Sequence, residues 1–147
     1  MNNKPVNFLL VEDDNIHAHL VSRSLEKSVV PVKVYRVANG ADALSFLRRQ
    51  GLYALEPRPD VVLLDLKLPK IDGHQVLAAI KADSDLRMIP VVVMTTSRDD
   101  ADREKAYRHH ANSYVVKPAD FARFRDVVTD ISHYWGTCNQ PPAASDS

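Results

Sequence analysis

Cysteine and glycine are scarce in this chain of 147 residues. The single cysteine, Cys138, cannot form a disulfide within the chain, which indicates a protein of a reducing compartment. There are four glycines, and none lies in the segment Glu12-Asp13-Asp14-Asn15, which follows the first apolar run. A dinucleotide-binding domain would need a glycine-rich turn at that point. The sequence therefore argues against such a domain.

The sequence also has no excess of one charge and no long apolar run. Lys+Arg and Asp+Glu both number 19, so the formal net charge is zero, whereas nucleic-acid or membrane binding usually needs a basic excess. No apolar run approaches the roughly 18 residues that span a bilayer. No leader with a charged and then an apolar part precedes the first run. We therefore expect a cytoplasmic protein of one domain, with no nucleic-acid or membrane partner.

Short apolar runs alternate with amphipathic segments along most of the chain. The runs expected to be β-strands are residues 8–11, 32–37, 60–65, 91–94 and 113–116. Each is followed by apolar residues at helical spacing. Alternating strands and helices predict an α/β fold with a doubly wound, five-stranded parallel sheet covered on both faces. We expect the domain to span residues 6–135 and residues 136–147 to be a disordered tail.

Polar side chains stand where four of these strands end. Asp65 is the most informative, because it closes a buried strand and faces a loop that contains Pro69 and Gly73. The matching groups at the other strand ends are Glu12 and Asp13, Thr95, and Lys117. In doubly wound sheets, ligands bind at the carboxyl ends of the strands, where the strand order reverses. These residues are therefore expected to form one site.

Four motifs make the sequence resemble a response-regulator receiver domain of two-component signalling systems. They are Val11-Glu12-Asp13-Asp14, Leu64-Asp65-Leu66-Lys67-Leu68-Pro69 with Asp72-Gly73, Met94-Thr95-Thr96-Ser97, and Tyr114-Val115-Val116-Lys117-Pro118. The resemblance covers residues 6–135. It implies a flavodoxin-like sheet with the strand order 2-1-3-4-5.

That strand order would bring the acidic residues of the first and third strands together, because neighbouring strands lie ~4.8 Å apart. Like charges at such distances raise one another's pKa, and a hard divalent cation relieves the repulsion. We expect a Mg²⁺ site, with Mn²⁺ as the alternative ion. Its ligands would be Asp13, Asp65, Glu12 (directly or through water) and the backbone carbonyl of Lys67.

The resemblance implies that Asp65 accepts a phosphoryl group from a histidine kinase and becomes an aspartyl phosphate. Lys117 would neutralise one phosphoryl oxygen, and the hydroxyl of Thr95 would donate to another. Such a protein is not a turnover enzyme but an acceptor that phosphorylates itself from a donor and dephosphorylates slowly. The alternative left open is a phosphorylation-independent protein-interaction module with the same fold.

The resemblance also implies a switch and a partner. After phosphorylation Thr95 would move toward the new oxygens and Tyr114 would rotate inward, which changes the face formed by the fourth helix, the fifth strand and the fifth helix. Only residues 136–147 follow Trp135, so no output domain is expected. The sequence resembles stand-alone receivers paired with bacterial phytochromes, which predicts a light-sensing histidine kinase as the partner. The downstream protein is not identified.

Apolar residues of the final helix form a candidate homodimer interface. Phe124, Val128 and Trp135 share one stripe at helical spacing, with Tyr134 partly off it. An apolar surface left over after core packing often marks an interface. The competing interpretation is that Tyr134 and Trp135 cover the bottom of the core.

Several other residues are given structural interpretations. Asp14 is expected to cap the first helix and Ser97 the fourth. The six histidines are interpreted as surface or loop residues that bind no metal. The peptide bond before Pro118 is expected to be cis, which proline permits at ~0.5–1 kcal/mol. His110 stands at a helix end where glycine is usual, and because a left-handed backbone costs more without glycine, this turn is expected to differ from the family's.

Overall fold

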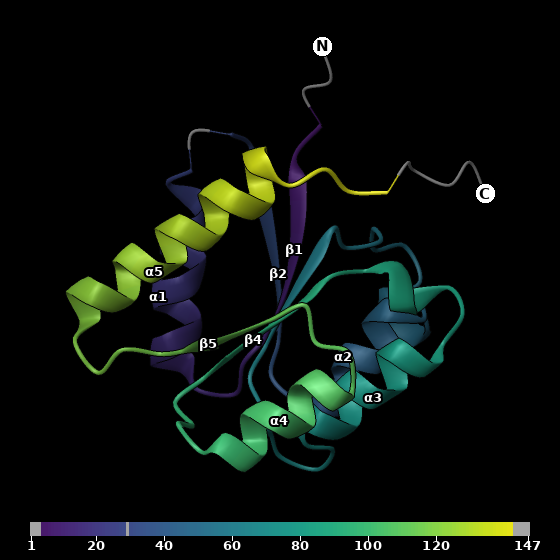
Figure 1. The fold of residues 1–147 in the computed structure, drawn as a ribbon. Coiled ribbons are helices and arrows are strands. Elements are labelled where there is room, and N and C mark those ends of the chain that lie inside the picture. The colour runs from purple at the N-terminus through teal and green to yellow at the C-terminus, as the bar shows by residue number, and fades with distance from the viewer. Residues whose placement is uncertain (1–3, 29, 143–147) are drawn as a thin grey trace.

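Five parallel strands form one sheet, in the order β2-β1-β3-β4-β5, within residues 4–28 and 30–142, which the computed structural model describes. The strands are β1 (Val6–Val11), β2 (Val32–Val37), β3 (Val61–Leu64), β4 (Val91–Thr95) and β5 (Ser113–Val116). The helices are α1 (Asn15–Glu26), α2 (Gly40–Leu47), α3 (Gly73–Ala82), α4 (Asp100–Arg108) and α5 (Phe121–His133). Helices α1 and α5 cover one face of the sheet, and α2, α3 and α4 lie on the other (Figure 1). The predicted doubly wound sheet and its strand order are confirmed.

The alternation of side chains along the central strands creates one apolar core on each face. In β3, Val61 and Leu63 belong to the core beneath α1 and α5, whereas Val62 and Leu64 belong to the core beneath α2 and α3. All four residues of β3 are buried, as expected for a central strand of a parallel sheet. Since both of its faces are covered, β3 has a fixed register, and this fixes the position of the residue that follows it.

Each helix begins at an Asp or Asn whose side chain accepts a backbone N–H of the first turn. These N-caps are Asp14, Asn39, Asp72, Asp99 and Asp120. The predicted cap of α1 is confirmed. The predicted cap of α4 is wrong, because Asp99 takes that position and the Ser97 hydroxyl instead accepts the backbone N–H of Asp99 at 3.2 Å. No helix among the described residues is long and apolar enough to cross a membrane.

The final helix does not carry the expected apolar stripe on its surface. Phe124 and Val128 are fully buried between α5, α1 and the sheet, so neither is available to a second copy in this conformation. Tyr134 remains half exposed, and its ring packs edge to face on Trp135 with the centroids 5.2 Å apart. A dimer stays a prediction that would now rest on Tyr134 and Trp135.

Helical geometry continues past the predicted domain boundary. A single π-helical turn, η3 (Tyr134–Cys138), follows α5 directly, so residues 136–138 of the expected tail are helical. Residues 139–142 have no regular structure. Residues 143–147 lie outside the described residues.

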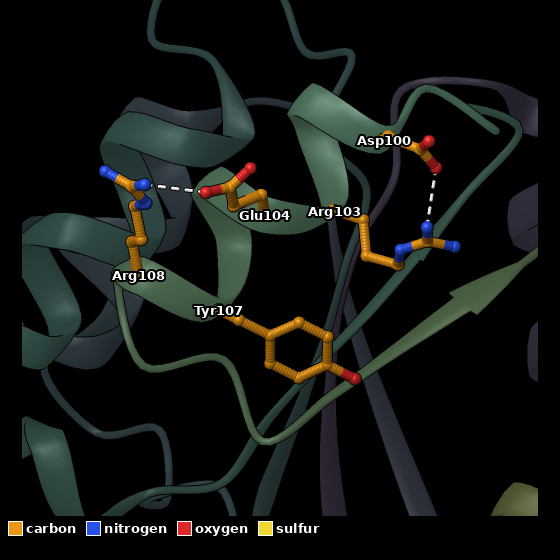
Figure 2. A pocket seen from close by; sticks show the side chains of 5 residues that line it. All are labelled: Asp100, Arg103, Glu104, Tyr107 and Arg108. Carbon is orange, nitrogen blue, oxygen red and sulfur yellow. Dashed lines mark hydrogen bonds and ion pairs between the residues drawn. The ribbon is translucent and has the colours of Figure 1, made fainter.

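The fourth helix has a highly charged outer face (Figure 2). Its ion pairs, Arg103–Asp100 at 2.5 Å and Arg108–Glu104 at 2.6 Å, join residues of the same helix and are exposed. Pairs of this kind contribute only ~0.2–0.5 kcal/mol each. Ala106 is the one fully buried residue of α4. This helix therefore has few apolar anchors.

Two predictions about the backbone are wrong. The cis peptide before Pro118 is wrong, since no cis bond occurs within the described residues. The backbone N–H of Lys117 donates to the Thr95 carbonyl at 2.7 Å, so the ladder between β4 and β5 continues to this point with the more stable trans isomer. The expected departure at the end of α4 is also wrong, because His110 adopts the left-handed conformation, with a φ of 68°, although it is not glycine.

Candidate functional site

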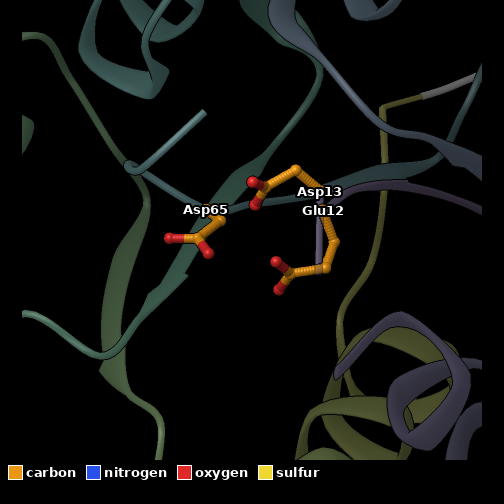
Figure 3. Close-up of side chains that lie close together, drawn as sticks. All are labelled: Glu12, Asp13 and Asp65. Carbon is orange, nitrogen blue, oxygen red and sulfur yellow. The ribbon is translucent and has the colours of Figure 1, made fainter. Parts of the chain in front are cut away.

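Three acidic side chains converge at the carboxyl ends of β1 and β3 (Figure 3). Val11 pairs with Leu64 across these strands, so Glu12 and Asp65 follow at the same level of the sheet. One oxygen from each of Glu12, Asp13 and Asp65 lies within 4.8 Å of the others. Glu12 and Asp65 are buried, while Asp13 is exposed. The cluster therefore opens to solvent on the side of Asp13.

The donor set of this cluster fits a hard divalent cation. It consists of carboxylate oxygens, without His or Cys, which favours Mg²⁺ or Mn²⁺ over Zn²⁺. Asp13, at the exposed side, provides the route by which an ion and its remaining waters could enter. The backbone N–H of Lys67 donates to Asp65 Oδ1 at 3.2 Å, so the loop after β3 turns back toward this carboxylate.

Lys117 crosses from the end of β5 to the acidic cluster, as predicted. Its ammonium donates to Glu12 Oε1 in a very short contact, to Asp65 Oδ2 at 3.0 Å and to His17 Nδ1 at 3.0 Å. The side chains of Lys117, Glu12 and Asp65 are all less than a tenth exposed. Three ammonium protons thus meet three acceptors, and the single buried positive charge lies between two buried acids.

His17 belongs to this site, so its interpretation as a surface residue is wrong. It lies in the first turn of α1 and is half buried, with its ring 5.5 Å from that of Phe124 at an angle of 65°. Helical side chains tilt toward the N-terminus of their helix. The first turn of a helix that directly follows two site residues therefore points back at the site, and this signal could have identified His17.

Burial perturbs the ionisation of Glu12 strongly. Desolvation raises its pKa from 4.5 to about 7, although the hydrogen bond and the charge of Lys117 pull it down; the charge of Asp65 adds to the rise. A folded-state pKa above the unfolded value means that Glu12 stabilises the fold fully below pH 4.5 and that this contribution is lost as the pH rises through about 7. Burial therefore destabilises the ionised form of Glu12, and a bound cation would offset this cost.

Cation affinity is expected to rise with pH in the range where Glu12 loses its proton. Below its pKa of about 7, a carboxylate that must deprotonate to bind a metal gains up to about tenfold in affinity per pH unit. Calorimetric titration of Mg²⁺ at several pH values measures this slope. In Glu12→Gln the slope should flatten, whereas Glu26→Gln, an exposed acid at the far end of α1, should keep it. An unchanged slope in Glu12→Gln would show that Glu12 is not the titrating ligand.

The predicted switch residues are linked through Ser97 rather than by direct contact. Thr95 is fully buried, and its hydroxyl accepts the backbone N–H of Ser97 at 3.3 Å. The half-buried Tyr114 donates its hydroxyl to the Ser97 carbonyl at 3.1 Å. The Ser97 side chain in turn donates to Asp102 Oδ2 at 2.6 Å. A movement of Thr95 would therefore be transmitted to the loop that precedes α4 and to Tyr114.

A second buried histidine also departs from the surface interpretation. His74, near the start of α3, is 8% exposed, and its Nε2 lies 3.1 Å from Asp102 Oδ1. Hydrogen bonds from Ser97 and then from His74 lower the pKa of Asp102. This carboxylate therefore ties α4, which has few apolar anchors, both to α3 and to the loop after β4.

Gly73 allows α3 to begin directly against the backbone of Asp65 and Leu66. A Cβ at this position would lie 2.3 Å from the Asp65 carbonyl oxygen and 2.4 Å from Leu66 Cα. Both obstacles are backbone atoms, which cannot turn away. The backbone N–H of Gly73 also donates to the Leu66 carbonyl at 2.9 Å, so the close approach is part of the loop's own hydrogen bonding.

Gly73→Ala is expected to destabilise the fold by about 3 kcal/mol, the upper end of the usual range for inserting atoms into a packed site. Thermal and denaturant unfolding measure the change. Gly136→Ala is the matched control, because its added Cβ would meet only a Val30 methyl group at 3.1 Å. Equal stability of the two variants would contradict the close approach at Gly73.

Comparison with known proteins gives a consistent result. Residues 8–129 match the family model described as response regulator receiver domain. The probable methanogenesis regulatory protein FilR2 of Methanothrix harundinacea is 45% identical over 94% of this chain and 88% of its own. Response regulator Rcp1 of Synechocystis is 40% identical over 97% of both chains. Its Mn²⁺-bound crystal structure superposes with a TM-score of 0.91 over 95% of this chain and all of that one.

A second solved structure is equally similar. The phosphorylated cyanobacterial phytochrome response regulator RcpA is 39% identical, with a TM-score of 0.92 over 95% of this chain and 100% of its own. These relatives match over 94–97% of this chain, so the similarity spans nearly its whole length.

Proposed function

The chain belongs to the response regulator receiver domain family, and we propose that Asp65 is its phosphoryl acceptor and Lys117 its charge-neutralising partner. The observation that carries this proposal is the position of the Asp65 carboxylate. It lies 3.0 Å from the buried Lys117 ammonium and close to Glu12 and Asp13 at the carboxyl edge of the sheet. We also propose residues 6–135 as the receiver unit and the cytoplasm as the place where it works.

In the proposed reaction, an oxygen of Asp65 attacks the phosphorus of a phosphohistidine. The new O–P bond forms as the P–N bond breaks, and the imidazole leaves with the bonding electrons and takes up a proton. A Mg²⁺ ion held by Glu12, Asp13, Asp65 and the Lys67 carbonyl would neutralise phosphoryl charge when bound. One N–H of the Lys117 ammonium changes its acceptor from a carboxylate oxygen to a phosphoryl oxygen, and no proton is transferred.

The proposed output is a change in the face formed by α4, β5 and α5. Thr95 would turn its hydroxyl from Ser97 to the phosphoryl group, and Tyr114 would lose its alignment with the Ser97 carbonyl and rotate inward. The charged α4 follows readily, because one buried alanine is its main apolar anchor. Couplings of this kind are typically worth ~1–3 kcal/mol.

The proposed donor is a sensor histidine kinase of the phytochrome type, such as a bacteriophytochrome. Its support is the similarity to RcpA, a cyanobacterial phytochrome response regulator. Short phosphotransfer assays from a phytochrome kinase and from an unrelated histidine kinase test this partner. A phytochrome kinase should label the chain much faster, and equal rates would contradict the pairing.

The acceptor function is tested directly by incubation with acetyl phosphate and Mg²⁺, followed by intact mass measurement. One phosphoryl group per chain is expected, lost on treatment with hydroxylamine and absent when EDTA removes the cation. A chain that takes up no phosphoryl group in Mg²⁺ would instead be a phosphorylation-independent interaction module.

A further inference from the structure

Of the three groups that accept a hydrogen bond from Lys117, two belong to the acidic cluster and one does not. Glu12 and Asp65 are carboxylates with further proposed roles in cation and phosphoryl binding, whereas the third group is an imidazole nitrogen, His17 Nδ1, 3.0 Å from the ammonium. We propose that His17 is a positioning residue that holds the Lys117 ammonium at the phosphoryl site while Glu12 and Asp65 bind the cation or the phosphoryl group. The inference rests on the function proposed above.

The orientation of the His17 ring is fixed from several sides. Asp14 accepts the backbone N–H of His17 at 3.1 Å and so anchors the first turn of α1. The ring packs edge to face on Phe124 of α5, a residue that is 1% exposed. An aromatic contact of this geometry restricts rotation of the imidazole. The contact between α1 and α5 therefore holds His17 with its Nδ1 directed at Lys117.

The chemistry of the contact determines which nitrogen carries the proton. An ammonium has three donors and no acceptor, so the hydrogen bond requires a lone pair on Nδ1. The imidazole is then neutral with its hydrogen on Nε2. A neutral nitrogen does not add to the negative charge of the cluster, and Mg²⁺ prefers oxygen to nitrogen. His17 can thus keep its hydrogen bond to Lys117 when the carboxylates turn to a cation.

The need for such an anchor follows from the lysine side chain. Its four-carbon stem is flexible, and an ammonium is a point donor without directional rigidity of its own. When the oxygens of Glu12 and Asp65 are shared with a cation, their hold on Lys117 weakens. The third acceptor then determines how much of the time the ammonium stays near the phosphoryl oxygens.

A purely structural role is the competing explanation, in which the ring only fills space against Phe124. Two substitutions separate the roles. His17→Asn places an amide oxygen close to the former Nδ1 and keeps an acceptor, but it removes part of the ring. His17→Leu keeps apolar bulk against Phe124 but has no acceptor. His19→Leu, on an exposed position of the same helix, is the control for helix effects.

The test measures the initial rate of phosphorylation by acetyl phosphate at saturating Mg²⁺. The positioning role predicts a rate about tenfold lower in His17→Leu, the usual consequence of losing one hydrogen bond to a charged group. His17→Asn should stay within about threefold of wild type, and His19→Leu should be unchanged. A wild-type rate in His17→Leu with a reduced rate in His17→Asn would overturn the proposal and favour packing.

A spectroscopic measurement tests the geometry without phosphorylation. Two-bond ¹H–¹⁵N spectra of the histidine rings should assign His17 to the Nε2–H tautomer, and Lys117→Met should abolish this preference. An Nδ1–H tautomer in the wild-type protein would overturn the proposal. If the wild-type chain accepts no phosphoryl group while the Nε2–H tautomer is observed, the contact stands and the proposed function fails.

Discussion

Asp65→Asn is expected to reduce phosphoryl acceptance to the detection limit, a loss of at least about three orders of magnitude, as is usual when a nucleophile is removed. The amide has nearly the same shape as the carboxylate, and its oxygen can still accept from Lys117. Its oxygen is nevertheless a poor nucleophile. The substitution also removes one of two buried acids, so we expect the fold to be retained. Intact mass after incubation with acetyl phosphate and Mg²⁺ measures the loss.

Asp14→Asn is the matched control for this experiment. Asp14 directly follows Asp13 of the acidic cluster, is exposed, and caps α1, a role that Asn fills about as well. This variant should accept phosphoryl groups at the wild-type rate. Labelling of Asp65→Asn at the wild-type rate would show that the acceptor has been assigned to the wrong residue.

Lys117→Ala is expected to fold but to accept phosphoryl groups about 10²–10³ times more slowly, the usual effect of removing one group that stabilises transition-state charge. Its second effect is on stability. Removal of a buried ammonium leaves Glu12 and Asp65, which are both almost fully buried, without their cation. Breaking a buried ion pair from one side typically costs ~3–5 kcal/mol.

The destabilisation of Lys117→Ala should respond to pH and to Mg²⁺. Protonation of Glu12, whose pKa burial already raises to about 7, relieves the repulsion in acid, and a bound cation relieves it at neutral pH. Thermal unfolding with and without Mg²⁺ should therefore show a larger stabilisation by Mg²⁺ in this variant than in wild type. Lys105→Ala, an exposed lysine of α4, should behave as wild type in both assays. A Lys117→Ala protein with wild-type stability and rate would contradict the central role of this lysine.

The strand pattern was sufficient to predict the fold and the place of the acids. Runs such as 91–94 are apolar on both faces, which only a covered parallel strand requires. A parallel sheet brings all carboxyl strand ends to one edge, so polar groups at those ends were expected to lie near one another. The strand order implied by the receiver resemblance places β1 beside β3, and Glu12, Asp13 and Asp65 do meet there.

The burial of the α5 stripe and the positions of two histidines could not be predicted in this way, because the periodicity of a sequence does not show what covers a helix face or where a side chain points. The spacing of α5 shows that Phe124 and Val128 share a face, but not that α1 and the sheet together cover that face completely. In the same way, the interpretation of His17 and His74 as surface or loop residues took no account of the direction in which the first turn of a helix points its side chains. Both histidines lie near the starts of helices at the functional edge of the sheet.

The most direct test of the account is to locate the phosphoryl group on the wild-type chain. Reduction of the phosphorylated protein with borohydride converts an aspartyl phosphate to homoserine, which peptide mass spectrometry can assign to a position. The account predicts that this conversion occurs at Asp65 and requires Mg²⁺. Conversion at Asp13 or at any other acid, with Asp65 unmodified, would contradict it.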